Sequence, residues 1–246
     1  NLVRLINEIT QFFNLNYHYD MIKERDNLFL ENQMVGRNKE MAKIMDFDTR
    51  VSDKLNHPNL IMLSGKNGMG KSRFLKEIDY RLKLRNRSVF TTNIEKNSDD
   101  EIVNIAELLL QAMNGAPSYL KEKYSEEFEM ILPQDNLDLK KDWKLDETYE
   151  ARKYRIFNRI ANYLKELATS KTIYLLIDNI QNGDAQFFDL LEYLIKTLKN
   201  TNVICILTFD TDELDNKEAL KKRIQKWKED LSQLEIDLGR LDLEEI

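Results

Sequence analysis

The sequence is poor in cysteine, proline and glycine and has no long apolar run. Its 246 residues include one cysteine, three prolines and seven glycines. The single cysteine, Cys205, cannot form an internal disulfide and lies inside an apolar stretch, which indicates a reduced intracellular protein. No stretch approaches the length of a membrane span, and no signal peptide is visible. We therefore expect a cytoplasmic protein with no membrane segment.

Positive charge is also in short supply. Lysine and arginine number 37 against 43 aspartates and glutamates, which leaves a net charge of −6. This balance argues against a nucleic-acid surface as the dominant feature, so nucleic acid is not expected as a partner of this segment. An anionic ligand would have to be held locally, by backbone N–H groups, a lysine and a metal ion.

Three of the seven glycines lie in one loop, which matches the pattern G-x-x-x-x-G-K-[ST]. An apolar run, Leu60 to Leu63, precedes it, and a helical pattern follows from Lys71 to Asn86, which is the context that a phosphate-binding loop requires. A glycine turn that matches the pattern by chance is the alternative. In the functional interpretation, loop N–H groups and the helix N-terminus hold the nucleotide phosphates. The residues expected there are Gly65, Lys66, Asn67, Gly68, Met69, Gly70, Lys71, Ser72 and Arg73.

A second motif is the apolar run Thr172 to Ile177, which ends in Asp178. Five consecutive apolar residues are typical of a strand buried on both faces, and a terminal acid would emerge at the carboxyl edge of a parallel sheet. Asp178 would then hold Mg²⁺ directly or through water, together with the hydroxyl of Ser72. The sequence thus predicts ATP or ADP with Mg²⁺ as the ligand, and Lys71 would contact the β- and γ-phosphates.

Two further segments are candidates for the site. Val35, Gly36 and Arg37 precede a predicted helix that runs to about residue 55, and they could border an adenine pocket. Thr208 ends a predicted strand, residues 202–209, where a polar side chain could sense the γ-phosphate. An ordinary threonine at a strand end is the equal alternative.

Strands and helices alternate through the second part of the chain, which predicts an α/β fold with a parallel sheet flanked by helices. Residues 93–145 break the pattern and are expected to form a helical insertion or cap over the sheet edge. Residues 1–32 are expected to form a helical extension, with a helix at 1–13 that could end an upstream domain. Because the chain begins at Asn1 and ends on an apparent helix start, we expect a segment of a larger protein.

Taken together, the motifs resemble one family. Val35 to Glu40, Gly68 to Leu75, Leu176 to Asp184, Ile206 to Phe209 and Leu238 to Leu241 occur in the order and spacing of the STAND subgroup of AAA+-related P-loop ATPases of the ASCE type, which includes switches of bacterial multidomain signalling regulators. The resemblance covers residues 33–246. It implies an ATPase domain with strand order 5-1-4-3-2, and a downstream lid domain that this segment lacks.

The sequence departs from that family at two positions. The family usually has a second acid after the Asp178 position, where this chain has Asn179, and an arginine after the sensor threonine, where this chain has Asp210. An amide cannot accept a proton from the attacking water, and a carboxylate opposes the charge that develops on the phosphate. The catalytic set implied by the resemblance, Lys71, Asp178, Asn179 and Thr208, is therefore expected to bind ATP but to hydrolyse it slowly.

Three functions are compatible with these residues. The first is a regulatory switch that binds ATP, hydrolyses it slowly or with assistance, and relays a conformational change to flanking domains or partner proteins, with an oligomer on ATP binding as one form of relay. The second is an origin-recognition-like ATPase associated with DNA. The third is a scaffold that binds nucleotide and never turns it over.

Overall fold

The computed structural model describes residues 34, 36–52, 58–95, 101–129, 149–230 and 233–241. The predicted helix at 1–13, the rest of the extension to residue 32, and Val35 lie outside these ranges. Within them, no helix has both the length and the apolar sequence that crossing a bilayer requires.

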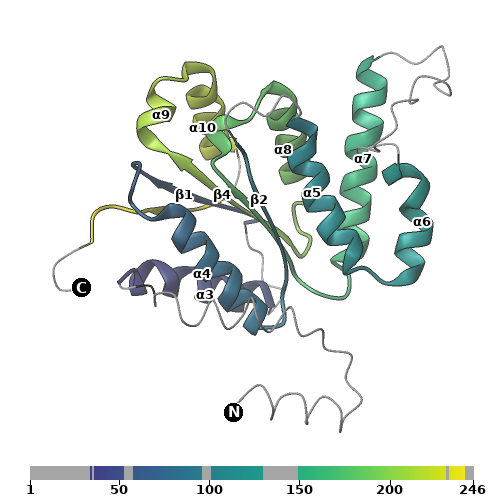
Figure 1. Ribbon diagram of the computed structural model, residues 1–246, viewed down its shortest axis with the longest axis horizontal. Helices are drawn as coiled ribbons and strands as arrows, with labels where there is room; N and C mark the ends of the chain where they lie inside the picture. The colour runs from purple at the N-terminus through teal and green to yellow at the C-terminus, as the bar shows by residue number, and fades with distance from the viewer. Residues whose placement is uncertain are drawn as a thin grey trace, which may run out of the picture.

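Five parallel strands form one sheet in the order β2-β3-β4-β1-β5. Read from the other edge, this is 5-1-4-3-2, so the predicted fold class and strand order are confirmed. Three strands carry the predicted site residues: β1 leads into the phosphate loop, β3 ends in Asp178, and β4 contains Thr208. The order places these three strands next to one another in the middle of the sheet (Figure 1). The strands are β1 (Leu60–Gly65), β2 (Ser88–Asn93), β3 (Ile173–Asp178), β4 (Val203–Asp210) and β5 (Gln233–Asp237).

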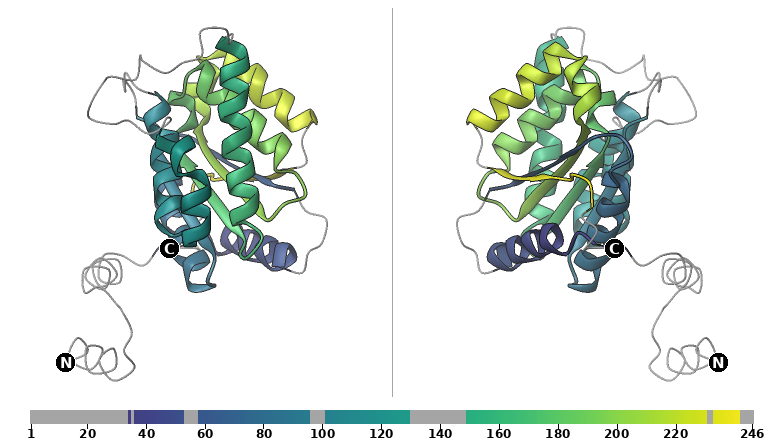
Figure 2. Two further views of the ribbon diagram at one scale, coloured as in Figure 1. Left: turned by 90° about the vertical axis from the view of Figure 1, so that its right-hand side faces the viewer. Right: turned by 90° about the vertical axis from the view of Figure 1, so that its left-hand side faces the viewer.

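Helices cover both faces of this sheet, which gives three layers (Figures 1 and 2). One face packs against α3 (Asn38–Ser52) and α4 (Lys71–Leu84). The other face packs against four further helices, and α6 packs against one of them, α7. These elements are α5 (Glu101–Asn114), α6 (Ser118–Glu129), α7 (Tyr149–Leu167), α8 (Ala185–Thr197) and α10 (Glu218–Asp230); a 3₁₀ turn, η1 (Ile180–Asn182), and a short helix, α9 (Thr211–Asp215), complete the described chain.

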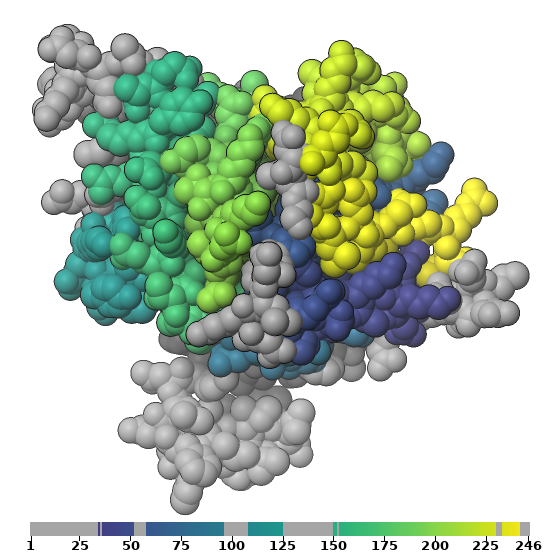
Figure 3. Space-filling view, turned by 180° about the vertical axis from the view of Figure 1, so that it is seen from behind, coloured from purple at the N-terminus to yellow at the C-terminus, as the bar shows by residue number. Residues whose placement is uncertain are grey.

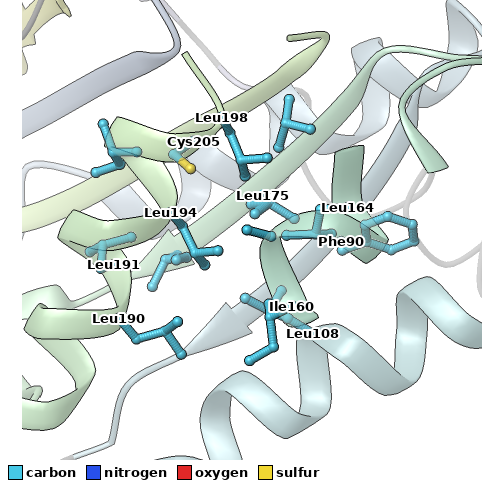
Figure 4. Packing of buried hydrophobic residues seen from close by; sticks show 14 of the residues in the cluster. Phe90, Leu108, Ile160, Leu164, Leu175, Leu190, Leu191, Leu194, Leu198 and Cys205 are labelled. Carbon is cyan, nitrogen blue, oxygen red and sulfur yellow. The ribbon is translucent and has the colours of Figure 1, made fainter. Parts of the chain in front are cut away.

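The core follows from the alternation of side chains along each strand. In β3, Tyr174 and Leu176 enter the cluster under α3 and α4, whereas the odd-numbered residues enter the cluster under α7 and α8. All six residues of β3 are buried, as an apolar run without polar interruption predicts. Figure 4 shows the leucines of α8 turned toward Leu175 of β3 and Cys205 of β4. Burial raises the pKa of the Cys205 thiol to about 12, so this cysteine is protonated and unreactive.

Some element boundaries differ from the prediction. The helix expected to run to Asn86 ends at Leu84, because Asn86 adopts a left-handed backbone with a φ of 59°. The structure also places a separate helix, α9, directly after β4, where none was predicted. The helical segment predicted within 93–145 contacts the edge strand β2 through α5, so it covers the sheet edge as expected.

A buried carboxylate, Asp48, ties α3 to the opposite end of the sheet from the phosphate loop. It accepts hydrogen bonds from Arg87 Nε at 2.7 Å, Arg85 Nη1 at 3.0 Å and the Tyr174 hydroxyl at 2.8 Å. Burial alone would raise the pKa of Asp48, but the hydrogen bonds from Arg87, Arg85 and Tyr174 outweigh it and hold the pKa below its ordinary value. The charged carboxylate therefore stabilises the fold by joining three elements.

We expect Asp48→Ala to lower the free energy of unfolding by about 1–3 kcal/mol, because it removes the acceptor of the buried Tyr174 hydroxyl and the charged partner of two partly exposed arginines. The matched control is Asp46→Ala on the same helix, whose side chain is 69% exposed and pairs with the exposed Arg50 at 3.0 Å; it should cost about 0–1 kcal/mol. Denaturant unfolding at neutral pH measures both. Because the folded-state pKa of Asp48 is lowered, its contribution is present above the ordinary aspartate pKa and is lost as the pH falls through the lowered value. Equal destabilisation by the two variants would contradict this role.

Candidate functional site

The turn between β1 and α4 forms a cradle for an anion. Gly68 and Gly70 adopt left-handed backbones with φ values of 80° and 86°, a conformation that glycine reaches without strain. Gly70 is the residue at which α4 begins, and the first N–H groups of a helix have no partner within it. Together with the positive end of the helix dipole, these groups make a site for phosphate oxygens.

The lysine of this loop is buried and fully engaged. Lys71 is 7% exposed, and its ammonium donates to the carbonyl oxygens of Gly65 at 2.8 Å and Lys66 at 2.9 Å. Its third contact is the carboxylate of Asp210, with Oδ2 at 3.1 Å. A lysine ammonium has three donors, so the described contacts use all of them.

The partner, Asp210, is the last residue of β4 and lies opposite Gly65 in the parallel register with β1. Its other oxygen, Oδ1, accepts the backbone N–H groups of Asp212 at 2.9 Å and Glu213 at 3.1 Å, which caps α9. Burial alone would raise the pKa of Asp210, but the hydrogen bond from Glu213 and the ammonium of Lys71 outweigh it. The pKa is held below its ordinary value, so the carboxylate is charged at neutral pH.

Asp178 and Thr208 meet at the same edge of the sheet, one at the end of β3 and one near the end of β4. The Thr208 hydroxyl donates to Asp178 Oδ1, and the backbone N–H of Asn179 lies 3.1 Å from that oxygen and 3.0 Å from Thr208 Oγ1. Both side chains are buried. The threonine therefore orients the carboxylate.

The side chains present fit a magnesium ion of the kind that accompanies nucleotides. Mg²⁺ prefers oxygen ligands and commonly takes one or two from the protein, with phosphate oxygens and waters supplying the rest. The exposed Ser72, on the first turn of α4, and the oriented carboxylate of Asp178 offer such oxygens. The part of the chain that the structure describes contains no cluster of three or more metal-ligating acids, histidines or cysteines. A metal ion at this position would therefore need phosphate oxygens of the nucleotide as further ligands.

Asn179 belongs to a network of amides that the sequence did not reveal. Its backbone is left-handed, with a φ of 57°, and its Nδ2 donates to Asn93 Oδ1 at the end of β2, at 2.8 Å. Gln181 Nε2 donates to Asn179 Oδ1 at 3.3 Å, and Gln181 Oε1 accepts the backbone N–H of Asp210 at 3.3 Å. These amides connect the edge strand β2 to the ion pair at Lys71.

Arg37 lies beside the phosphate loop, but its guanidinium contacts backbone carbonyls. It is buried, pairs with Glu40 at 3.2 Å, and donates to Met69 O at 3.4 Å and to Gly239 O. Gly239 follows β5, and Figure 3 shows this C-terminal part of the described chain against α3. Arg37 thus connects the phosphate loop to the segment after β5.

The start of the phosphate loop also packs directly against the segment after β5. A Cβ atom on Gly65 would lie 2.8 Å from the carbonyl oxygen of Leu238, so a side chain there would force the backbone to move. The Leu238 N–H donates to Ser64 O at 2.8 Å. The glycine that starts the loop is therefore needed for close packing against residue 238.

The structure brings most of the predicted site residues to one edge of the sheet. The loop from Gly65 to Arg73 joins β1 to α4, and Asp178, Asn179 and Thr208 lie at the ends of the adjacent strands. Gly36 and Arg37 adjoin the loop, whereas Val35 lies outside the described residues. The contacts that sequence reasoning missed are those of Asp210 with Lys71 and of Asn93 and Gln181 with Asn179. The order 5-1-4 alone could have indicated the first, because it places the end of β4 beside the loop.

Comparison with solved structures gives likenesses at low sequence identity. The Aeropyrum pernix ORC2 protein has a TM-score of 0.47 at 12% identity over 84% of this chain and 49% of that one. AMPPCP-bound DnaA from Aquifex aeolicus gives 0.43 at 19% identity, over 85% and 50%. Drosophila ORC bound to AT-rich DNA and Cdc6 gives 0.46 at 11% identity, over 82% and 55%. The chain spans about half the length of these proteins.

Comparison of the sequence with curated proteins gives no match. The model of one protein family, described as the AAA ATPase domain, matches residues 33–207, which is more than half of the chain and contains the phosphate loop, Asp178 and the sheet strands β1 to β3 with most of β4. A parallel sheet in the order 5-1-4-3-2 with this loop after β1 is the fold that the match requires. The chain belongs to the family of AAA ATPase domains.

Proposed function

We propose that this domain is a nucleotide-dependent switch that binds Mg·ATP or Mg·ADP at the loop from Gly65 to Ser72, hydrolyses ATP slowly, and relays the change to neighbouring segments. The observation that carries the proposal is the buried Lys71, held at the mouth of an intact phosphate loop beside an oriented Asp178. Membership of the AAA ATPase family supports nucleotide binding. The switch role rests on Arg37, and the slow turnover rests on Asn179 and Asp210.

On the phosphate side, each role follows from the chemistry of the group. Loop N–H groups and the start of α4 would hold the β-phosphate, and Lys71 would bridge the phosphates. Ser72 and Asp178 would hold Mg²⁺, whose charge would offset that of the phosphates. Thr208, which donates to Asp178, would keep that carboxylate in place.

The adenine side is proposed at Gly36 and Arg37, with Val35. The position of Arg37 against Met69 supports this, because it lies on the phosphate-loop side of the sheet. Since its guanidinium is engaged by carbonyl oxygens, we propose that Arg37 shapes the wall of the pocket and that the base meets the backbone of Gly36, whose φ is 75°. Glycine permits that close approach.

Slow turnover is proposed because the groups that activate water are weak. Asp178 is committed to its contacts with Thr208 and a metal, and Asn179 can orient water but cannot accept its proton. Asp210 adds a negative charge next to Lys71, where the transition state also accumulates negative charge. The nucleotide state would then persist until a partner or a second copy supplies the missing groups.

The relay is proposed to run through Arg37. Arg37 donates to Met69 O in the loop and to Gly239 O after β5. A movement of the loop would therefore shift the segment that follows β5. The close packing of Gly65 against Leu238 is a second contact through which a movement of the loop would reach this segment. Flanking domains or regulatory partners that contact this segment would receive the signal.

The first test is nucleotide affinity. Lys71→Ala removes a charged donor to phosphate and should weaken Mg·ADP binding by about 10- to 100-fold, since such a contact contributes about 1.5–3 kcal/mol. Lys76→Ala, an exposed lysine on the same helix, should leave affinity unchanged. Calorimetry measures binding, and thermal unfolding confirms that each variant is folded. Equal affinity in the wild type and Lys71→Ala would refute the proposed site.

The second test is turnover. We expect steady-state phosphate release well below about 1 s⁻¹, a low value on the usual enzyme scale. Asn179→Asp introduces a carboxylate that can accept a proton and tolerates the left-handed backbone, so it should raise the rate by about tenfold or more. Lys71→Ala gives the background from contaminating enzymes. A Lys71-dependent rate of about 1 s⁻¹ or more in the wild type would show that another residue activates water.

The third test is the relay. Saturating Mg·ADP should slow amide exchange both in the loop and at Leu238, whose N–H is bonded to Ser64. In Arg37→Ala the slowing should persist in the loop but be clearly smaller at Leu238, because the bond to Gly239 is lost while the contact of Leu238 with Ser64 remains. Arg50→Ala on α3, an exposed arginine, should behave as the wild type. Retention of the full response in Arg37→Ala would rule out this route.

A further inference from the structure

The ion pair at the phosphate loop has a consequence for the number of phosphates that the site prefers. Lys71 has three donors, and its three acceptors are two loop carbonyls and the carboxylate of Asp210. A terminal phosphate can reach the ammonium only if one acceptor is displaced or if the phosphate shares a donor with it. Of the three, Asp210 is the only anion, so it occupies the contact that a phosphate oxygen would make.

The carboxylate is not free to swing away. Oδ1 accepts two backbone N–H groups that start α9, and the Asp210 N–H donates to Gln181 Oε1. The residue is also the last pair in the parallel ladder, opposite Gly65. Its side chain is 5% exposed, so water screens its charge poorly. A phosphate arriving at Lys71 would therefore meet a fixed, unscreened negative charge.

A nucleoside diphosphate and a triphosphate differ in how close their terminal phosphates come to the Asp210 carboxylate. Backbone N–H groups of such a loop and the start of α4 hold the α- and β-phosphates, so a diphosphate has partners there besides Lys71. The lysine reaches the β- and γ-phosphates, and the γ-phosphate lacks the loop N–H groups that hold the other two, so it depends most on Lys71. The added charge of a triphosphate thus falls on the side of Asp210.

We propose that Asp210 is a specificity-determining residue that makes this site prefer a nucleoside diphosphate to a triphosphate, its carboxylate taking at Lys71 the place of the terminal phosphate. The inference rests on the proposed nucleotide binding at this loop and adds which nucleotide the resting domain holds. A triphosphate would then bind well only when Mg²⁺ or a partner offsets the negative charge of Asp210.

The experiment compares Mg·ADP with Mg·AMPPNP, a triphosphate analogue that resists hydrolysis, by calorimetry on the 246-residue chain. The wild type should bind the diphosphate about tenfold or more tightly, since like charges in close contact oppose binding strongly. Asp210→Asn keeps an Oδ1 that can cap α9 but removes the charge; it should tighten AMPPNP by about tenfold with a change in ADP affinity below about threefold. Asp215→Asn, the same change at an exposed position of α9, should keep the wild-type ratio.

Asp210→Ser, which can also cap a helix, provides a second neutral variant if Asp210→Asn is unstable, and thermal unfolding reports on folding in both. An equal affinity of the wild type for the two nucleotides, or a ratio that neither neutral variant changes, would overturn the inference while leaving nucleotide binding intact. Weaker AMPPNP binding in the neutral variants, seen only with Mg²⁺, would identify Asp210 as a metal ligand and overturn it too. No binding of either nucleotide to the wild type or the variants would instead overturn the proposed function, and this inference with it.

Discussion

The position of β4 between β3 and β1 is the constraint on which the site depends. Parallel pairing places Thr208 beside the end of β3 and Asp210 opposite Gly65, so one strand presents a hydroxyl to Asp178 and a carboxylate to Lys71. Side chains alternate along a strand, and these two residues share a face because they are two apart. A slip of one residue would turn both away from their partners and would bring apolar side chains into the site.

Features with a local pattern could be predicted from the sequence. The phosphate loop has its own spacing and a strand and helix on either side, and Asp178 ends an apolar run that only a buried strand explains. The order of the strands followed from the family resemblance, and it places Asp178 and Thr208 together without further information. Residues 173–177 illustrate why this works: all five are apolar and all are buried, so composition and structure agree at each of these positions.

Contacts between distant side chains could not be predicted in the same way. Asp210 was recognised as a negative charge in place of an arginine, but its distance to Lys71 depends on how β4 aligns with β1. Arg37 was predicted to border an adenine pocket, but its contacts with two carbonyls 32 and 202 residues away, which accompany a left-handed backbone with a φ of 61°, leave no local pattern in the sequence. Helix α9 was missed because five residues are too few to show a periodic pattern, although a capping aspartate and two acids in the first turn mark its start.

That aspartate belongs to two structures at once, since one oxygen holds the start of α9 and the other holds the lysine. By thermodynamic reciprocity, whatever loosens the carboxylate from the lysine also changes how firmly the helix is anchored, and the converse holds with equal magnitude. With nucleotide at the proposed site, the first turn of α9 would therefore be coupled to the occupancy of the loop through Asp210. A protein that bound α9 would change the affinity for nucleotide, although it would contribute no atom to the nucleotide site.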